Sequence, residues 1–495
     1  MWSFLPIFLP AQINPLPNPE TAFVETTQEP RSQEAIAASF PYFLTRTIAE
    51  AQEIRPLPGQ LDRVPVFNSN SPEVVYGTGI LLSTFPKAGM AEASAHLNYP
   101  LQGRFDIFTH HIARSHRSSD WRPIYHGVLI YNPGNRAINV HVLQGLSYVT
   151  TPDAPFIDLP SRLDNSSGSV FSGPGSRLTN DILRGLSQSG FPSQLTIPPR
   201  SVQTLFSLPI RLGNARSTLI RLRSDGAVHV ASLAMPAPLR NPPKPPAGVD
   251  LLDPLKVLEN TPIPSRPVPH RSPSLEEWAQ LVVRGSLATP RDRSPTPLDA
   301  KTDDPIYGRV AGVAMGSQWQ TVVTDDDRSR TLAIPAAGEA FSYPLSSLPQ
   351  GTFGTGQVQS APMLVRYPDT AYLANGNYGI HYYLTLPLVN NTDEPRRVAI
   401  ALSTPLKEDG DRGELRFLDP PEDRVFFRGT VQVRYTDERG RVRTQAYHLV
   451  QRRGQQGEPL VTLTLPPRDR RDVKIDFLYP PDATPPQVLT VRTSN

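Results

Sequence analysis

Proline is the feature that most limits how this chain can fold. The 495 residues include 56 prolines, about twice the roughly 5% share of an average protein. Proline lacks a backbone N–H, and it interrupts both helix interiors and central strands. The composition therefore favours short strands, loops and linkers over helical bundles.

Length and polarity narrow the class further. A single hydrophobic core stops growing at roughly 250–300 residues, so we expect two or more domains. Apolar residues make up 38% and charged residues 19%, which excludes a disordered chain and a helical membrane protein. No stretch approaches the roughly 18 apolar residues of a membrane span, so we expect no transmembrane span.

Charge and cysteine content exclude several function classes. The 49 Lys and Arg nearly balance the 46 Asp and Glu, and no basic stripe of the nucleic-acid-binding kind is present, so we expect no nucleic-acid partner. The chain has no cysteine, which excludes disulfides, thiolate zinc sites and cysteine nucleophiles. Such a composition is compatible with an oxidising compartment.

Residues 1–58 are predicted to be a leader. The apolar stretch 2–11 resembles the end of a secretory signal's hydrophobic region, although the basic segment is missing and Pro6 and Pro10 interrupt it. A truncated or atypical signal peptide is one interpretation of this start. A Pro-rich segment follows, and a short helix is predicted over residues 42–54.

Two later regions have the pattern of β structure. We predict a mainly β fold with two related β-sandwich modules, immunoglobulin-like or jelly-roll-like, at residues 59–235 and 305–495. The expected strands are 125–131, 137–143, 194–197, 205–210, 218–222 and 228–233 in the first region, and 381–389, 398–402, 430–435, 444–450, 461–465 and 473–478 in the second. One short helix is expected to follow Thr179 and to end near Gly185 or Gly190.

The two regions share a pair of landmarks in the same order. Each has an Asn-led turn after a strand, at Asn132 and Asn390, and each later has a strand that ends in Pro-Pro-Arg, at 198–200 and 466–468. The landmarks lie 66 residues apart in the first region (132 to 198) and 76 in the second (390 to 466). Strand–turn–strand units are common, so chance is a rival explanation, but two ordered landmarks favour a duplicated module.

Residues 236–304 are predicted to be a Pro-rich linker that contains one helix. Ser274 and Glu277 have the spacing of a capping box, an apolar stripe runs through 275–284, and Gly285 suits a C-cap. We expect this helix to pack on a domain.

Histidines are the first place to look for a metal site. Six of the ten lie in one stretch, at His96, His110, His111, His116, His126 and His141. Successive strand residues point to opposite faces, so His110 and His111 cannot bind one ion together in a regular strand. Asp106, His110 and His126 are the candidate ligands, but no tight His-x-His or His-Glu-x-x-His spacing supports them. Ordinary strand histidines explain the same residues.

The loops carry no complete motif. Residues 408–414 resemble a calcium loop without its ligand spacing, and 351–356 and 172–176 are glycine-rich without a nucleotide-binding context. The stretch 185–190 misses the Gly-x-Ser-x-Gly register by one residue. We therefore name no catalytic or cofactor-binding residue, and we expect neither a metal nor a nucleotide to be needed for folding.

Tyrosines next to amides form the candidate ligand-binding set. Tyr372, Tyr378 and Tyr382 crowd one stretch together with Asn375 and Asn377. Exposed aromatic rings beside amides are typical of a carbohydrate-binding face. Strand-core aromatics are the alternative explanation.

Four stretches of the chain resemble a known family: Arg55–Asp62, Val66–Glu73, Gly312–Trp319 and Phe426–Thr430. They are similar to an uncharacterised cyanobacterial family known as a domain of unknown function, from about Arg55 to the C-terminus. The resemblance implies a cyanobacterial source and an envelope location, and it brings no activity, cofactor or catalytic residue.

These observations lead to two functional hypotheses. The first is a non-enzymatic bacterial envelope protein with a structural, scaffolding or polymer-binding role. It would be located in the periplasm, at the outer membrane or outside the cell, with a surface polysaccharide or another envelope protein as partner. The alternative is an enzyme that acts on cell-surface polysaccharide or peptidoglycan. An enzyme should gather acidic or histidine side chains in a deep cleft, whereas a scaffold should present aromatic or mixed surfaces.

Overall fold

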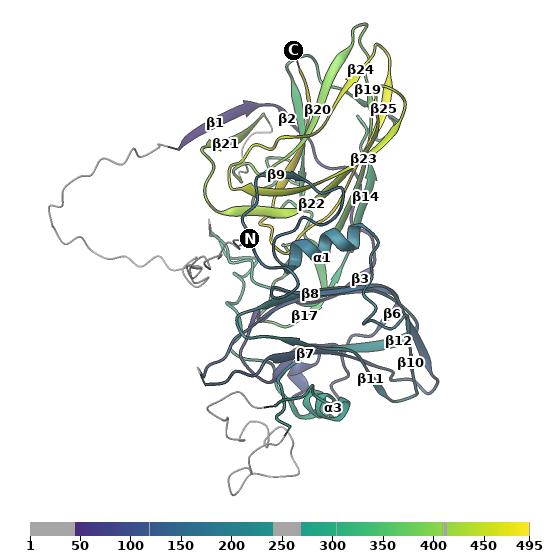
Figure 1. Ribbon diagram of the computed structural model, residues 1–495, viewed down its shortest axis with the longest axis vertical. Coiled ribbons are helices and arrows are strands. Elements are labelled where there is room, and N and C mark those ends of the chain that lie inside the picture. The colour runs from purple at the N-terminus through teal and green to yellow at the C-terminus, as the bar shows by residue number, and fades with distance from the viewer. Residues whose placement is uncertain are drawn as a thin grey trace, which may run out of the picture. The chain divides into compact units, whose positions relative to one another are not determined.

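The chain folds almost entirely into β-strands. The computed structural model describes residues 45–240 and 269–494, apart from Ser118, Asp303, Glu408 and residues 410–412. These residues form 26 strands and two α-helices (Figure 1), so the predicted mainly β fold is confirmed. No helix in these ranges is long and apolar enough to span a membrane. Most of the predicted leader and the Pro-rich residues 241–268 lie outside the described residues.

The largest sheet has twelve strands and is built mostly from the first half of the chain. Its strands are β3 (Pro65–Ser69), β4 (Val74–Val75), β5 (Gly79–Ser83), β6 (Leu101–Ala113), β7 (Ile124–Tyr131), β8 (Ile138–Val149), β10 (Gln194–Ile197), β11 (Val202–Ile210), β12 (Ala215–Pro236), β13 (Ala311–Met315), β17 (Ala361–Arg366) and β18 (Leu373–Ala374).

β12 belongs to two layers of this sheet. Its first half pairs with β6 and β8, and its second half pairs with β5 and β7 after a register shift between Ser224 and Val228. Buried residues from both halves, such as Ile220 and Val230, join one hydrophobic cluster with Phe105 and Val128. One long strand thus supplies both faces of a core.

A seven-stranded and a five-stranded sheet share the other large core. The first contains β9 (Arg162–Asp164), β14 (Gln318–Val322), β15 (Leu332–Ala333), β19 (His381–Val389), β22 (Val425–Thr436), β23 (Val442–Arg452) and β25 (Arg470–Leu478). The second contains β2 (Glu53–Ile54), β16 (Ala340–Leu345), β20 (Arg396–Ser403), β24 (Pro459–Leu465) and β26 (Gln487–Thr493). Alternate residues of strands in both sheets are buried in one cluster, as expected for strands with one face in a core.

The same pairing scheme occurs in both halves of the chain. β8 lies between β10 and β12, and β20 lies between β24 and β26. The strands before and after them also correspond, because β7 pairs with β11 and β19 pairs with β25.

Strand pairing also links the two predicted regions. β13 and β17, from the second region, extend the twelve-stranded sheet through β3. In the other direction, β9 pairs with β23.

The prediction of a helix at 42–54 is wrong for the residues that the structure describes. Residues Arg46–Ala51 form β1, which pairs antiparallel with β21 (Glu414–Asp419), and β2 follows at once. The few apolar residues of this segment would form only a weak helical stripe, and a short isolated helix is marginal in water. Cross-strand contacts such as Ile48 opposite Phe417 stabilise the extended form instead.

The structure contains a helix near each of the other two predicted positions, but the first begins at Pro174, five residues before Thr179. α1 (Pro174–Leu183) contacts strands of the twelve- and seven-stranded sheets, and buries Leu178 and Ile182. α3 (Leu275–Arg284) begins at Ser274 with the predicted capping box. Figure 1 shows α3 packed against the layer of β7, β11 and β12, where Trp278 is fully buried.

Candidate functional site

The three candidate metal ligands lie apart from one another. Asp106 and His110 lie on β6, four residues apart on one face, which corresponds to about 13 Å along a strand. His126 lies on β7, where its ring meets His111 at a centroid distance of 5.2 Å. His111 points to the opposite face from His110. No group of three His, Asp or Glu within the described ranges could hold a metal ion.

His126 belongs to a buried chain of polar side chains. Its Nε2 lies 2.9 Å from Ser232 Oγ, Ser232 lies 3.0 Å from Ser69, and Ser69 lies 3.0 Å from His111 Nε2. His111 Nδ1 lies 2.9 Å from the carbonyl oxygen of Pro72, to which a protonated Nδ1 donates. Burial lowers the pKa of His111 to about 3 and that of His126 well below its usual value. These hydrogen-bonded side chains connect layers of the sheet and are buried from solvent.

His110 lies in a second cluster. Its Nδ1 lies 2.8 Å from Ser217 Oγ and its Nε2 lies 3.9 Å from a Glu73 oxygen, while Arg309 pairs with the other oxygen of Glu73. Burial raises the pKa of Glu73, against the lowering effect of Arg309. Asp482, near the first turn of α1, is half-buried, and desolvation of its carboxylate raises its pKa to about 6. Perturbed carboxylates of this kind are found both in active sites and in structural ion-pair networks.

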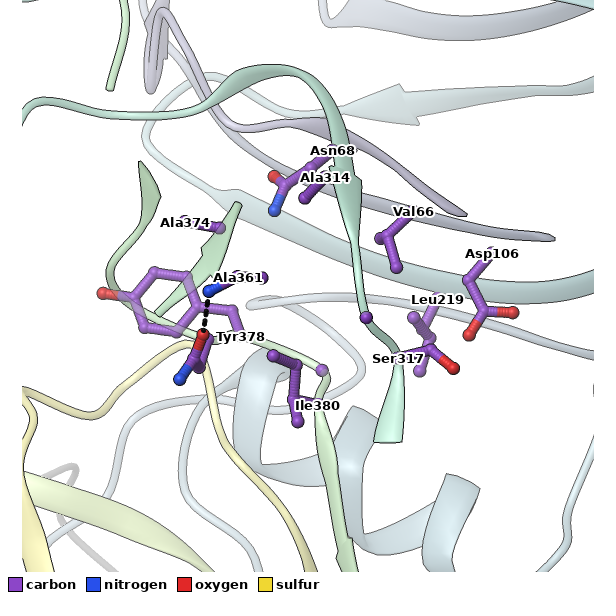
Figure 2. A pocket seen from close by; sticks show the side chains of 13 residues that line it. Val66, Asn68, Asp106, Leu219, Ala314, Ser317, Ala361, Ala374, Tyr378 and Ile380 are labelled. Atoms are coloured by element: carbon purple, nitrogen blue, oxygen red, sulfur yellow. Dashed lines mark hydrogen bonds between the residues drawn. The ribbon is translucent and has the colours of Figure 1, made fainter. Parts of the chain in front are cut away.

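Asp106 lines a small cavity where several strands meet. The cavity measures about 10 Å³, about the space of one water molecule. Figure 2 shows Asp106 and Ser317 near one end and Tyr378 at the other. Burial raises the pKa of Asp106, and its partner Arg104 opposes this effect. The cavity is too small for an organic ligand.

The candidate tyrosines have different surroundings. Tyr382 is fully buried in the core, where its hydroxyl donates to Gln359 at 3.1 Å, as the strand-core alternative predicts. Tyr378 is half-buried and directs its hydroxyl to the carbonyl of Ala483. Tyr372 lines a pocket of about 150 Å³, and Arg366 lies 4.0 Å above its ring. Of the three, Tyr372 is the one placed to meet a ligand.

Polar groups of the candidate loops contact other residues of the protein. Asp409 accepts hydrogen bonds from the backbone N–H groups of Gly351 and Thr352 at 2.9 and 2.6 Å, so it joins two loops that the sequence singled out separately. At the start of α1, the Asp482 carboxylate lies 3.0 Å from where a Cβ on Gly175 would stand. A phosphate at this helix terminus would therefore meet a carboxylate.

A cavity of ligand size lies elsewhere, between the β6–β7 loop and the β11–β12 turn. It measures about 660 Å³, within the usual range for ligand sites. We call it the arginine–tryptophan groove, and its lining is Arg114, Ser115, Arg117, Asp120, Trp121, Pro123, Arg211, Leu212, Gly213 and His270.

Hydrogen bonds between the residues on either side of Trp121 fix the backbone that carries its exposed side chain. Arg122 pairs with Asp120 through two hydrogen bonds of 3.0 and 2.9 Å, and Trp121 lies between these two residues in the chain. The indole is 66% exposed. At the other end of the loop, His116 stacks on Tyr76 with ring centroids 4.2 Å apart. Contacts on both sides thus hold the loop that presents the ring.

The charges in the groove are mostly positive. Within the described part of the chain, Asp120 is the one carboxylate in the lining. Partial burial alone would raise the pKa of Asp120, but the hydrogen bonds from Arg122 hold it below its usual value. Arg114, Arg117 and Arg211 form no ion pair within 4.0 Å in these ranges, although the charge of Arg117 also helps to lower the pKa of Asp120. The groove is therefore suited to a ligand that offers a ring face and negative charge.

Comparison with known proteins decides the family. The model of a family described as "Protein of unknown function (DUF3370)" matches residues 52–493. The chain belongs to this family. The sequence-based resemblance to a domain of unknown function is thereby confirmed.

Other comparisons add no function. No curated protein matches the chain. Among solved structures, the coconut allergen cocosin is 10% identical over 86% of each chain, with a TM-score of 0.11. Pumpkin seed globulin is 8% identical over 86% of each chain, with a TM-score of 0.10. TM-scores this low show no shared fold, so these proteins indicate nothing about function.

Sequence reasoning missed the groove of this DUF3370 protein. A signal was present, because Trp121 and four basic residues fall within nine positions, 114–122. Overall charge is nearly balanced, so the local excess was not apparent from composition. Arg211 and His270 are distant in sequence, and the fold brings them to the same groove.

Proposed function

We propose that this chain is a non-enzymatic, extracytoplasmic protein of the bacterial envelope that binds a surface polysaccharide in the arginine–tryptophan groove. A cyanobacterial source and an envelope location are parts of this proposal. They rest on the sequence resemblance, the absence of cysteine and the apolar stretch 2–11.

The observation that carries the proposal is the exposed, braced indole of Trp121 in a groove of about 660 Å³. Aromatic rings bury well against the apolar faces of sugars, and an exposed ring that lines a groove is placed for such a contact. The ion pair between Asp120 and Arg122 fixes the loop, so less conformational entropy is lost when a ligand binds.

Binding to a glycan array, compared between the wild-type chain and Trp121→Ala, tests this proposal. We expect wild-type binding to at least one bacterial surface glycan and a loss of about tenfold or more in the variant, since burying an aromatic ring contributes a few kcal/mol. Leu143→Ala is the control, because Leu143 is 51% exposed on β8 and does not line the groove. Equal binding by both variants would contradict the proposal. Cell fractionation tests the location, and a purely cytoplasmic protein would contradict it.

An enzyme acting on polysaccharide or peptidoglycan is the second candidate. It is favoured by the half-buried carboxylates Glu73 and Asp482, whose pKa values are raised by desolvation, and by His110 beside Glu73. None of these residues lines the groove. Release of reducing ends from a bound glycan, abolished by Glu73→Gln, would establish this candidate over the first.

A further inference from the structure

We infer that the polysaccharide bound in the arginine–tryptophan groove is acidic and carries carboxylate or sulfate groups. The inference rests on the proposed function and names its ligand class. Trp121 supports a sugar ring, whereas the class of sugar follows from the arginines.

Arginines are paired unevenly over the described surface. Elsewhere, many arginines have carboxylate partners, as in Arg291 with Asp369 and Arg271 with Glu277. Arg114 and Arg211 have none among the described residues, and Arg117 has only a longer-range attraction to Asp120, although all three line one groove. Like charges gathered within about a Debye length of ~10 Å repel one another. An anionic ligand removes this repulsion.

Two of these arginines have a fixed placement. Arg114 follows the last residue of β6, and Arg211 follows the last residue of β11. The two segments are joined by hydrogen bonds from Gly213 N to Ala113 O at 2.8 Å and from Ala113 N to Asn214 O at 3.0 Å. The backbones that carry the guanidinium groups are therefore held together before any ligand binds, which favours binding.

Chemical fit supports the same ligand class. The planar guanidinium group donates two parallel hydrogen bonds to a carboxylate or sulfate, with strength that a neutral hydroxyl does not match. An acidic sugar unit offers such a group beside a ring face that can cover the indole of Trp121. A neutral glycan would use the indole and leave the arginines unpaired.

The experiment compares four probes by isothermal titration calorimetry with the full chain: oligogalacturonate, its methyl-esterified neutral form, a sulfated heparin oligosaccharide and a single-stranded DNA oligonucleotide. We expect an acidic oligosaccharide to bind at least about tenfold more tightly than the neutral form, because hydrogen bonds to charged groups are stronger than those to neutral groups. Binding should weaken as salt is added.

Variants assign the effect to the groove. Arg114→Gln and Arg211→Gln should each weaken binding of the acidic probe about tenfold, with an unchanged melting temperature. Arg223→Gln is the matched control, because Arg223 is exposed on β12, unpaired within the described ranges and outside the groove lining. The control should bind like the wild type.

The outcomes separate the two proposals. Equal binding of the acidic and esterified probes, lost in Trp121→Ala, would overturn the acidic class and leave the polysaccharide-binding function standing. Equal binding of DNA and acidic glycans, unaffected by Trp121→Ala, would show a general polyanion site and overturn both proposals. Binding of no glycan would also overturn both.

Discussion

Asn132 and Asn390 close the same turn in the two halves of the chain, with carbonyl partners at matching positions. Both side chains are fully buried. The Asn132 Nδ2 group donates to the carbonyls of Arg136, Ile197 and Pro198 at 2.7, 2.9 and 3.1 Å. The Asn390 Nδ2 group donates to those of Glu394, Leu465 and Pro466 at 2.8, 3.0 and 3.0 Å.

This relationship explains the two sequence landmarks. The Asn-led turn and the later Pro-Pro-Arg segment are joined by direct hydrogen bonds in each half, although 66 and 76 residues separate them. Arg200 and Arg468, the last residues of these segments, both have positive φ, at 55° and 62°. The same tight reversal thus leads into β11 and β25. The matching detail favours duplication over chance.

Asn132→Ala and Asn390→Ala should each destabilise the protein by about 2–4 kcal/mol, because each substitution leaves buried carbonyls without a donor. Urea unfolding measures the change in the free energy of unfolding. Asn135→Ala and Asn391→Ala are the controls in the same turns, and both residues are exposed. Losses of under 0.5 kcal/mol for the buried asparagines would show that they do not hold the turns.

The sequence predicted elements well wherever local pattern and tertiary structure agreed. The strand at 381–389 and the helix at 275–284 were located to the residue, because strand alternation and a capping box are local signals. The helix prediction for residues 46–54 was wrong, because these residues form strands by pairing with residues more than 280 positions away. Long-range pairing of β13 with β3 could not be inferred for the same reason.

The candidate site was less predictable than the fold. Asp106, His110 and His126 were chosen by residue type, but the positions of β6 and β7 separate them. The groove depends on Arg114, Trp121 and Arg211 meeting across two loops. Loop juxtaposition of this kind has no sequence periodicity, so it becomes visible only in three dimensions.

α3 should be part of the stable core. Trp278 is fully buried, and a Cβ on Gly127 of β7 would lie 2.7 Å from its ring. We expect Trp278→Ala to lower the free energy of unfolding by about 3–5 kcal/mol, because it leaves a cavity. Gly127→Ala should lower it by about 1–3 kcal/mol through overpacking. Thermal unfolding provides the measurement. Val283→Ala, at a 43% exposed position of the same helix, should have little effect. Similar small effects for all three variants would mean that α3 is only loosely attached.

Stability should decrease in acid because of buried neutral histidines. Burial lowers the pKa of His111 to about 3 and that of His110 to about 4, whereas the value in an unfolded chain is about 6.5. Between these values the unfolded state binds protons that the folded state does not. Stability is therefore unaffected above about pH 7 and falls below about pH 6, with a slope that approaches ~1.4 kcal/mol per pH unit for each histidine.

The measurement is the difference in pH dependence between wild type and His111→Asn from urea unfolding at pH 4.5 to 7.5. Asp482 contributes with the opposite sign, since burial raises its pKa to about 6 and its contribution is lost as pH rises. The comparison of slopes removes this common contribution. His111→Asn should reduce the slope of the free energy of unfolding against pH below about pH 6. His141→Asn, at an exposed position, should leave this slope unchanged. Identical slopes in all three proteins would contradict the argument.

Removing metal ions should leave the melting temperature unchanged. The side chains that might have bound a metal already have protein partners: Arg104 for Asp106, Ser217 for His110, Ser232 for His126, and the backbone of Gly351 and Thr352 for Asp409. Large apolar clusters stabilise the described sheets. Thermal unfolding with and without excess EDTA tests this expectation. A decrease of several degrees, reversed by one divalent cation and absent in Asp409→Asn, would instead show that the loop around Asp409 binds a structural ion.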